Sequence, residues 1–203
     1  MRRGRNVVSV LRVTDRPPSW DDRCRSFGRL YALKQAGGPA EDGPSYGLAG
    51  PLYHTQDGCL ALGVPNAFVR GVFSALREPG VELPPGRPGG RFDARVVVMT
   101  PDELRQVGGP DRVSERGRSF AYSLGRLYSA APADWPGVAR VWYVKVYSPE
   151  LQRLRLSYGL PPLPRPDADS FRLVVAVRRR GVLGRNATAK TGPPLDPGLP
   201  ASF

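Results

Sequence analysis

The stretches DARVVVM (residues 93–99) and SFRLVVAV (residues 170–177) decide the fold of this chain. Both are short runs rich in β-branched and other apolar residues, bounded by polar residues, which is typical of β-strands. Each carries an arginine near its start and a valine two positions later. The sequence therefore predicts two similar strands in different parts of the chain.

Side chains two apart on a strand lie on the same face. Arg95 therefore shares a face with Val97 on the first strand, and Arg172 shares a face with Val174 on the second. The opposite face of each strand is wholly apolar. We expect the apolar faces to lie in the core and the arginine-bearing faces to border a cleft or solvent.

This pattern resembles the 2H phosphoesterase family, which includes the LigT-like, 2′,5′-RNA-ligase-like and cyclic-phosphodiesterase-like proteins. The family's signature is two His-x-Thr/Ser triplets on equivalent strands of a pseudo-symmetric fold. The local context is similar to that of small phage-type members, and the resemblance covers roughly residues 50–190. It implies an α+β fold of two lobes, each an antiparallel sheet with flanking helices, closing around a central cleft.

The chain departs from the family at all four motif positions. Arg95 and Arg172 stand where the family has His, and Val97 and Val174 stand where it has Thr or Ser. In the family one His acts as base, the other as acid, and the hydroxyls hold the phosphate. Because arginine does not deprotonate and valine donates no hydrogen bond, we expect no conventional hydrolysis of 2′,3′-cyclic nucleotides or 2′,5′-linked oligonucleotides.

Two arginines facing one cleft would form a strong phosphate site. The resemblance thus implies a catalytically degenerate protein that binds a nucleotide, a cyclic oligonucleotide or an RNA end through Arg95 and Arg172. The alternative is that these arginines are exposed strand residues, or pair with acids such as Asp93 or Asp169. Two other functions stay open: a phage or prophage structural or interaction protein that uses the fold as a scaffold, and an active phosphodiesterase that works through other residues.

Two further side chains are candidates for a role in the site. Tyr122 lies on an expected strand that could flank the cleft, where its ring would stack on a base; core packing is the alternative. His54 is the only histidine, so it cannot supply both acid and base, and we expect a structural or surface role. The sequence has no Cys/His cluster of the metal-binding type, and we expect neither metal nor cofactor.

The composition favours an anionic partner. Among 203 residues there are 30 Lys+Arg and 18 Asp+Glu, for a net charge of +12, as nucleic-acid- and nucleotide-binding proteins often have. An arginine-rich composition from a GC-rich genome is the alternative. Cys24 and Cys59 are too few for a disulfide framework, so we expect free thiols. No apolar run reaches the ~18 residues of a membrane span, and we expect a cytoplasmic protein without membrane contact.

The chain divides into a basic arm (1–22), a 2H-phosphoesterase-like domain (23–185) and a Gly/Pro-rich tail (186–203). The termini are candidates for contact with a protein partner. Helices are expected after the capping residues Thr100 and Ser148, each followed by Pro and an acid. The other expected elements are an edge strand at Val7–Val13, a helix at Arg25–Gln35, a loop at Gly37–Gly50, strands at Cys59–Val64, Arg95–Met99, Phe120–Leu127 and Val138–Tyr147, and a helix from Pro65-Asn66 to Pro79-Gly80.

Overall fold

The computed structural model describes residues 19–36, 47–84, 92–133 and 135–180. The expected edge strand at Val7–Val13 and the expected tail at 186–203 lie outside these residues. In the described part of the chain, no helix has the length and apolar composition needed to cross a membrane.

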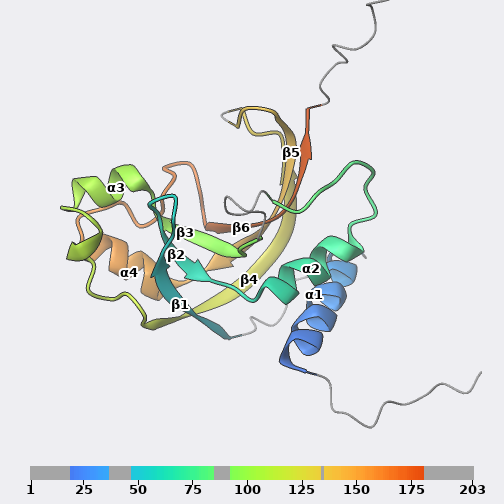
Figure 1. Ribbon diagram of the computed structural model, residues 1–203, viewed down its shortest axis with the longest axis horizontal. Helices are drawn as coiled ribbons and strands as arrows, with labels where there is room; N and C mark the ends of the chain where they lie inside the picture. Colours follow the sequence, from blue (N-terminus) through green and yellow to red (C-terminus); the bar gives the residue numbers. More distant parts are fainter. Residues whose placement is uncertain (1–18, 37–46, 85–91, 134, 181–203) are drawn as a thin grey trace, which may run out of the picture.

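Within the described ranges, six antiparallel strands form the centre of the structure (Figure 1). They pair in the order β1-β2-β3-β6-β5-β4, and β1 also pairs with β4, so the sheet closes on itself as a barrel. Closure leaves none of these strands as a free edge along its whole length. The strands are β1 (Leu48–His54), β2 (Leu60–Gly63), β3 (Arg95–Met99), β4 (Ser119–Ala130), β5 (Val138–Tyr147) and β6 (Phe171–Arg179).

The expected α+β class and antiparallel pairing are confirmed. The finer expectation of two lobes with one sheet each is not confirmed, because the six strands pair into a single sheet. Strand β1 begins within the last residues of the expected loop at Gly37–Gly50 and continues to His54. A Cβ on Gly50 would lie 2.1 Å from the carbonyl oxygen of Gly63. Glycine at this position therefore permits a close contact with β2. In the sequence, the same glycine favoured a loop.

Strands β3 and β6 alternate as their sequences predict. On β3 the core face carries Ala94, just before the strand, then Val96 and Val98, all at most 2% exposed. On β6 the core face carries Phe171, Leu173, Val175 and Val177, which are equally buried. Of the side chains between them, Arg95, Val97, Arg172 and Val174 are half-buried on the opposite face, whereas Ala176 is fully buried. The apolar face of each strand is therefore confirmed as core.

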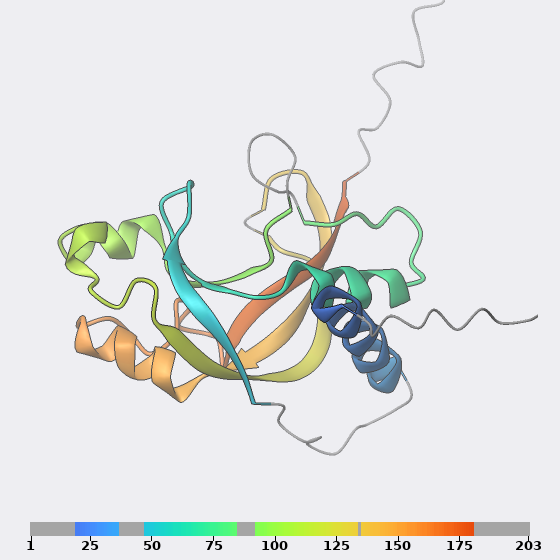
Figure 2. The same ribbon diagram turned by 60° about the horizontal axis from the view of Figure 1, so that its bottom comes forward.

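Helices α1 (Trp20–Ala36) and α2 (Asn66–Ala75) lie side by side against one part of the barrel (Figure 2). Their backbones touch, because a Cβ on Gly28 would lie 2.2 Å from the Phe68 carbonyl oxygen. Both helices were expected, but α1 begins earlier than predicted, within the last residues of the supposed arm.

Helices α3 (Pro101–Gln106) and α4 (Pro149–Ser157) lie on the far side of the barrel from α1 and α2 (Figures 1 and 2). A short 3-10 turn, η1 (Pro110–Arg112), follows α3. The Thr100 hydroxyl accepts from the Glu103 backbone N–H, and the Glu103 carboxylate accepts from the Thr100 N–H at 2.9 Å. Ser148 likewise accepts from the Leu151 N–H at 3.2 Å. The predicted helix starts at Thr100 and Ser148 are therefore confirmed.

A buried arginine joins these two helices to the sheet. Arg155 of α4 has no solvent exposure, and its guanidinium contacts both Glu103 carboxylate oxygens, at 2.6 and 3.1 Å. It also donates to the carbonyl oxygens of Val98 and Pro161. Burial raises the pKa of Glu103, but hydrogen bonds from Arg155 and Thr100 outweigh it, so the pKa lies below its usual value.

Candidate ligand-binding pocket

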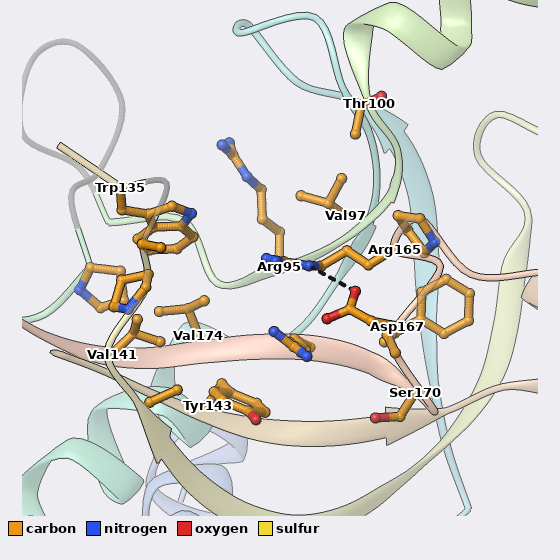
Figure 3. Close-up of a pocket in the computed structure, with 18 of the residues that line it drawn as sticks. Arg95, Val97, Thr100, Trp135, Val141, Tyr143, Arg165, Asp167, Ser170 and Val174 are labelled. Carbon is orange, nitrogen blue, oxygen red and sulfur yellow. Dashed lines mark ion pairs between the residues drawn. The ribbon is translucent and has the colours of Figure 1, made fainter.

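A pocket of about 1060 Å³ opens on the face of β3, β6 and β5 that points away from the core. The loop before β6 and the connection between β4 and β5 form its other walls (Figure 3). Its volume is at the upper end of the range for small-molecule sites. Most of its lining is apolar, and the charged residues that line it, among those that the structure describes, are Asp93, Arg95, Arg165, Asp167 and Arg172.

All four motif positions line this pocket: Arg95, Val97, Arg172 and Val174. They meet there because β3 pairs antiparallel with β6, with Val96 opposite Leu173. In an antiparallel pair, the residue that precedes one member lies beside the residue that follows the other. The two Arg-x-Val triplets are therefore related by an approximate local twofold axis through the Val96–Leu173 pair.

Arg95 has acidic partners. Its Nη2 lies 2.5 Å from a carboxylate oxygen of Asp57, in the turn between β1 and β2, and its Nη1 lies 3.9 Å from Asp93. The Tyr53 hydroxyl donates to that Asp93 oxygen at 2.8 Å. The alternative that Arg95 pairs with an acid is thus correct, although Asp57 is closer than the Asp93 considered from sequence.

Arg172 has a different environment. Its guanidinium carbon lies 4.9 Å from the centre of the Tyr143 ring, a cation–π contact. Among the described residues no carboxylate pairs with it. Asp169, the acid considered from sequence, ion-pairs instead with Lys145 of β5. Arg172 therefore has donors available for an anionic ligand.

Aromatic side chains lie beside the arginines. Tyr143 stacks against Tyr128 of β4, with ring centres 5.9 Å apart. Trp135 and Tyr143 both line the pocket (Figure 3). Neither residue was predicted from the sequence to lie at the site. Tyr143 alternates with the buried Trp142 and Val144 on β5, which placed it on the outward face, but only the β5–β6 register brings it under Arg172.

Two candidates from the sequence do not lie in the pocket. Tyr122 is 4% exposed and packs in the core, and burial raises its pKa to about 12. Its place beside the cleft is therefore corrected: β4 alternates Phe120, Tyr122 and Leu124 inward. His54 does not line the pocket either, and its buried Nε2 has no hydrogen-bond partner among the described residues.

The described residues offer little for acid–base or metal chemistry at this place. The described part of the pocket wall has neither His nor Cys, and no group of three His, Cys, Asp or Glu in residues 19–36, 47–84, 92–133 and 135–180 could hold a metal ion. Cys24 and Cys59 are free, as predicted, and burial raises the pKa of both thiols. The arrangement suits recognition of an anion attached to an apolar or aromatic group.

Comparison of the chain with protein-family models, with curated proteins and with solved structures found no match in any of the three.

Proposed function

We propose that this chain is a catalytically degenerate 2H-phosphoesterase-like protein that binds a phosphorylated ligand in the pocket. The ligand would be a nucleotide, a cyclic oligonucleotide or an RNA end. Its phosphate would bind Arg172 and Arg95, and its base would lie against Tyr143 and Trp135. In this proposal the closed sheet corresponds to the two halves of the family's fold, with the β3–β6 pair at their junction.

The observation that carries the proposal is the position of the two triplets. Both Arg-x-Val triplets, on strands far apart in sequence, line one pocket around the Val96–Leu173 pair. Unrelated exposed arginines would have no reason to meet in this way. The surrounding aromatic rings suit a nucleobase, because rings stack on bases with little dependence on their identity.

Binding without turnover follows from the side chains that replace the family's catalysts. Arginine cannot exchange protons near neutral pH, and valine cannot hold a phosphate oxygen. Tyr122 and His54, which an active phosphodiesterase could use in place of the missing histidines, do not line the pocket. Burial also raises the pKa of Tyr122 to about 12. We expect no hydrolysis of 2′,3′-cyclic nucleotides, and turnover at the ~1 per second typical of enzymes would contradict this part of the proposal.

A second candidate function has one observation in its favour. Helix α1 exposes Trp20, Leu30 and Leu33, at 65%, 59% and 56%, and large exposed apolar side chains often mark contact with another protein. This favours the interaction-scaffold function, which does not exclude ligand binding. The cytoplasmic location and a protein partner for the termini stay predictions.

Ligand binding can be tested by calorimetry at physiological salt with 2′,3′-cyclic nucleotides, cyclic dinucleotides and short RNA. We expect binding by the wild type and loss of it in the double variant Arg95→Ala/Arg172→Ala. The matched control is Arg140→Ala/Arg153→Ala, which removes the same charge from two exposed positions outside the pocket. Equal binding by the wild type and the Arg95/Arg172 variant would overturn the proposal, and equal losses in both variants would reduce it to general electrostatic attraction.

A further inference from the structure

The three arginines in the described wall of the pocket differ in how their charge is matched. Arg95 ion-pairs with Asp57, and the Nε of Arg165 lies 3.6 Å from Asp167. Arg172 is the one of the three without a carboxylate partner among the described residues. The pocket therefore presents two arginines whose charge is partly matched and one whose charge is available.

Asp57 reaches Arg95 from outside the pocket. It lies in the turn between β1 and β2, its side chain is 55% exposed, and it does not line the cavity. Asp93, the other acid near Arg95, is farther away at 3.9 Å and accepts a hydrogen bond from Tyr53. Asp57 is thus the acid that most directly occupies the Arg95 guanidinium, and it does so without blocking the pocket.

The charge of a phosphate ligand depends on its esterification. A phosphomonoester carries close to two negative charges above its second pKa of about 6, whereas a phosphodiester carries one. One available guanidinium matches one negative charge. A second charge on the ligand would face the carboxylate of Asp93 in the pocket wall, with no unmatched cation beside it among the described residues, and like charges at short range repel.

We propose that Asp57 determines the charge specificity of this pocket: by pairing with Arg95 it leaves Arg172 as the available cation, so the pocket prefers phosphodiester monoanions to phosphomonoester dianions. This inference rests on the proposed phosphate-binding function. It also predicts that the two arginines contribute unequally, although the two motif strands are related by local symmetry.

The test compares three ligands with the same nucleoside at pH 8: the 2′,3′-cyclic phosphate, the open 3′-methyl phosphodiester and the 3′-monophosphate. Including two diesters separates the effect of charge from that of ring shape. For the wild type, calorimetry should give similar affinity for both diesters and weaker binding of the monophosphate. Asp57→Asn should raise monophosphate affinity about tenfold, the effect of one extra charge-assisted hydrogen bond, and should change diester affinity less than about threefold.

Two control variants separate the role of Asp57 from general charge effects. Asp57→Glu keeps the carboxylate and should keep the wild-type preference. Asp102→Asn removes the same charge from another Asp–Arg pair, the exposed Asp102–Arg105 pair of α3 outside the pocket, and should also keep it. A melting temperature for each variant identifies any that is not folded.

The outcomes distinguish this inference from the function on which it rests. If no ligand binds the wild type, the phosphate-binding function fails and the inference fails with it. If ligands bind but the monophosphate binds as tightly as the diesters, or Asp57→Asn leaves the ratio unchanged, only the role of Asp57 is overturned. An equally large change in the ratio of monophosphate to diester affinity in Asp102→Asn would also overturn the role of Asp57.

Discussion

Arg155 and Arg172 are two arginines of the same domain with opposite environments. Arg155 is fully buried and its donors are taken by Glu103 and by two backbone carbonyls. Arg172 is half-buried, borders the pocket, and rests on the ring of Tyr143. A buried guanidinium that makes four hydrogen bonds stabilises the fold. A guanidinium that lies on a ring, with no carboxylate partner among the described residues, keeps its donors for a ligand.

The largest effect on stability is expected from removal of the buried arginine. Arg155→Ala leaves Glu103 without its partner in a partly buried site, and we expect it to lower the free energy of unfolding by about 3–5 kcal/mol. Urea denaturation measures the change. Arg153→Ala, an exposed neighbour on the same helix, is the control and should shift it by less than about 0.5 kcal/mol.

Removal of Arg172 should lower ligand affinity and leave stability nearly unchanged. Arg172→Ala should weaken binding of a phosphodiester ligand about tenfold to a hundredfold, because charge-assisted hydrogen bonds contribute roughly 1.5–3 kcal/mol. Its stability should change little, since only the contact with Tyr143 is lost. A large loss of stability with unchanged affinity would place Arg172 in the same class as Arg155.

Acid should weaken the pair formed by Glu103 and Arg155. The pKa of Glu103 is lowered from its usual 4.5, so the ionised form stabilises the folded state above that value, and this contribution is lost as the pH falls through the lower folded pKa. Unfolding measured from pH 6 to pH 3 should therefore show a steeper loss for wild type than for Glu103→Gln. Glu78→Gln, an exposed acid, should follow the wild-type curve, and parallel curves for all three proteins would argue against the pair.

The smallest expected effect concerns the ring under Arg172. Tyr143→Leu should weaken ligand binding about twofold to fivefold, equivalent to roughly 0.5–1 kcal/mol for a cation–π contact. Tyr143→Phe keeps the ring and should bind like wild type. Tyr147→Leu, another exposed tyrosine of β5 outside the pocket, is the control. Should Tyr143→Phe bind as weakly as Tyr143→Leu, the hydroxyl rather than the ring would be the group that matters.

Local patterns in the sequence predicted much of this structure. The bounds expected for β3 and β5 agree with those observed, because alternation of apolar residues and the capping residues Thr100 and Ser148 are signals within a few residues. The direction of Arg95 and Arg172, away from the core, also follows from alternation alone. What was missed depends on distant partners: β1 pairs with β2 and β4, and Gly50 permits its close approach to Gly63.

The same distinction holds for the side chains of the site. Tyr122 and Tyr143 both lie on strands, and their neighbours in the sequence are of a similar kind. Tyr122 nevertheless lies in the core, whereas Tyr143 borders the pocket. Only the inward or outward direction of each strand, set by its pairing, decides between them. The burial of Arg155 could not be predicted from the sequence either, since an arginine on a short polar helix usually lies at the surface.

Closure of the sheet has a consequence for how the protein folds. Two of the pairings that close it, β1 with β4 and β3 with β6, join residues far apart along the chain, and such contacts form slowly because a long loop must first be ordered. The two Arg-x-Val triplets of the pocket come from β3 and β6, so they meet only once that late pairing is complete. A ligand that binds there would select the finished barrel from its partly folded precursors and slow its unfolding.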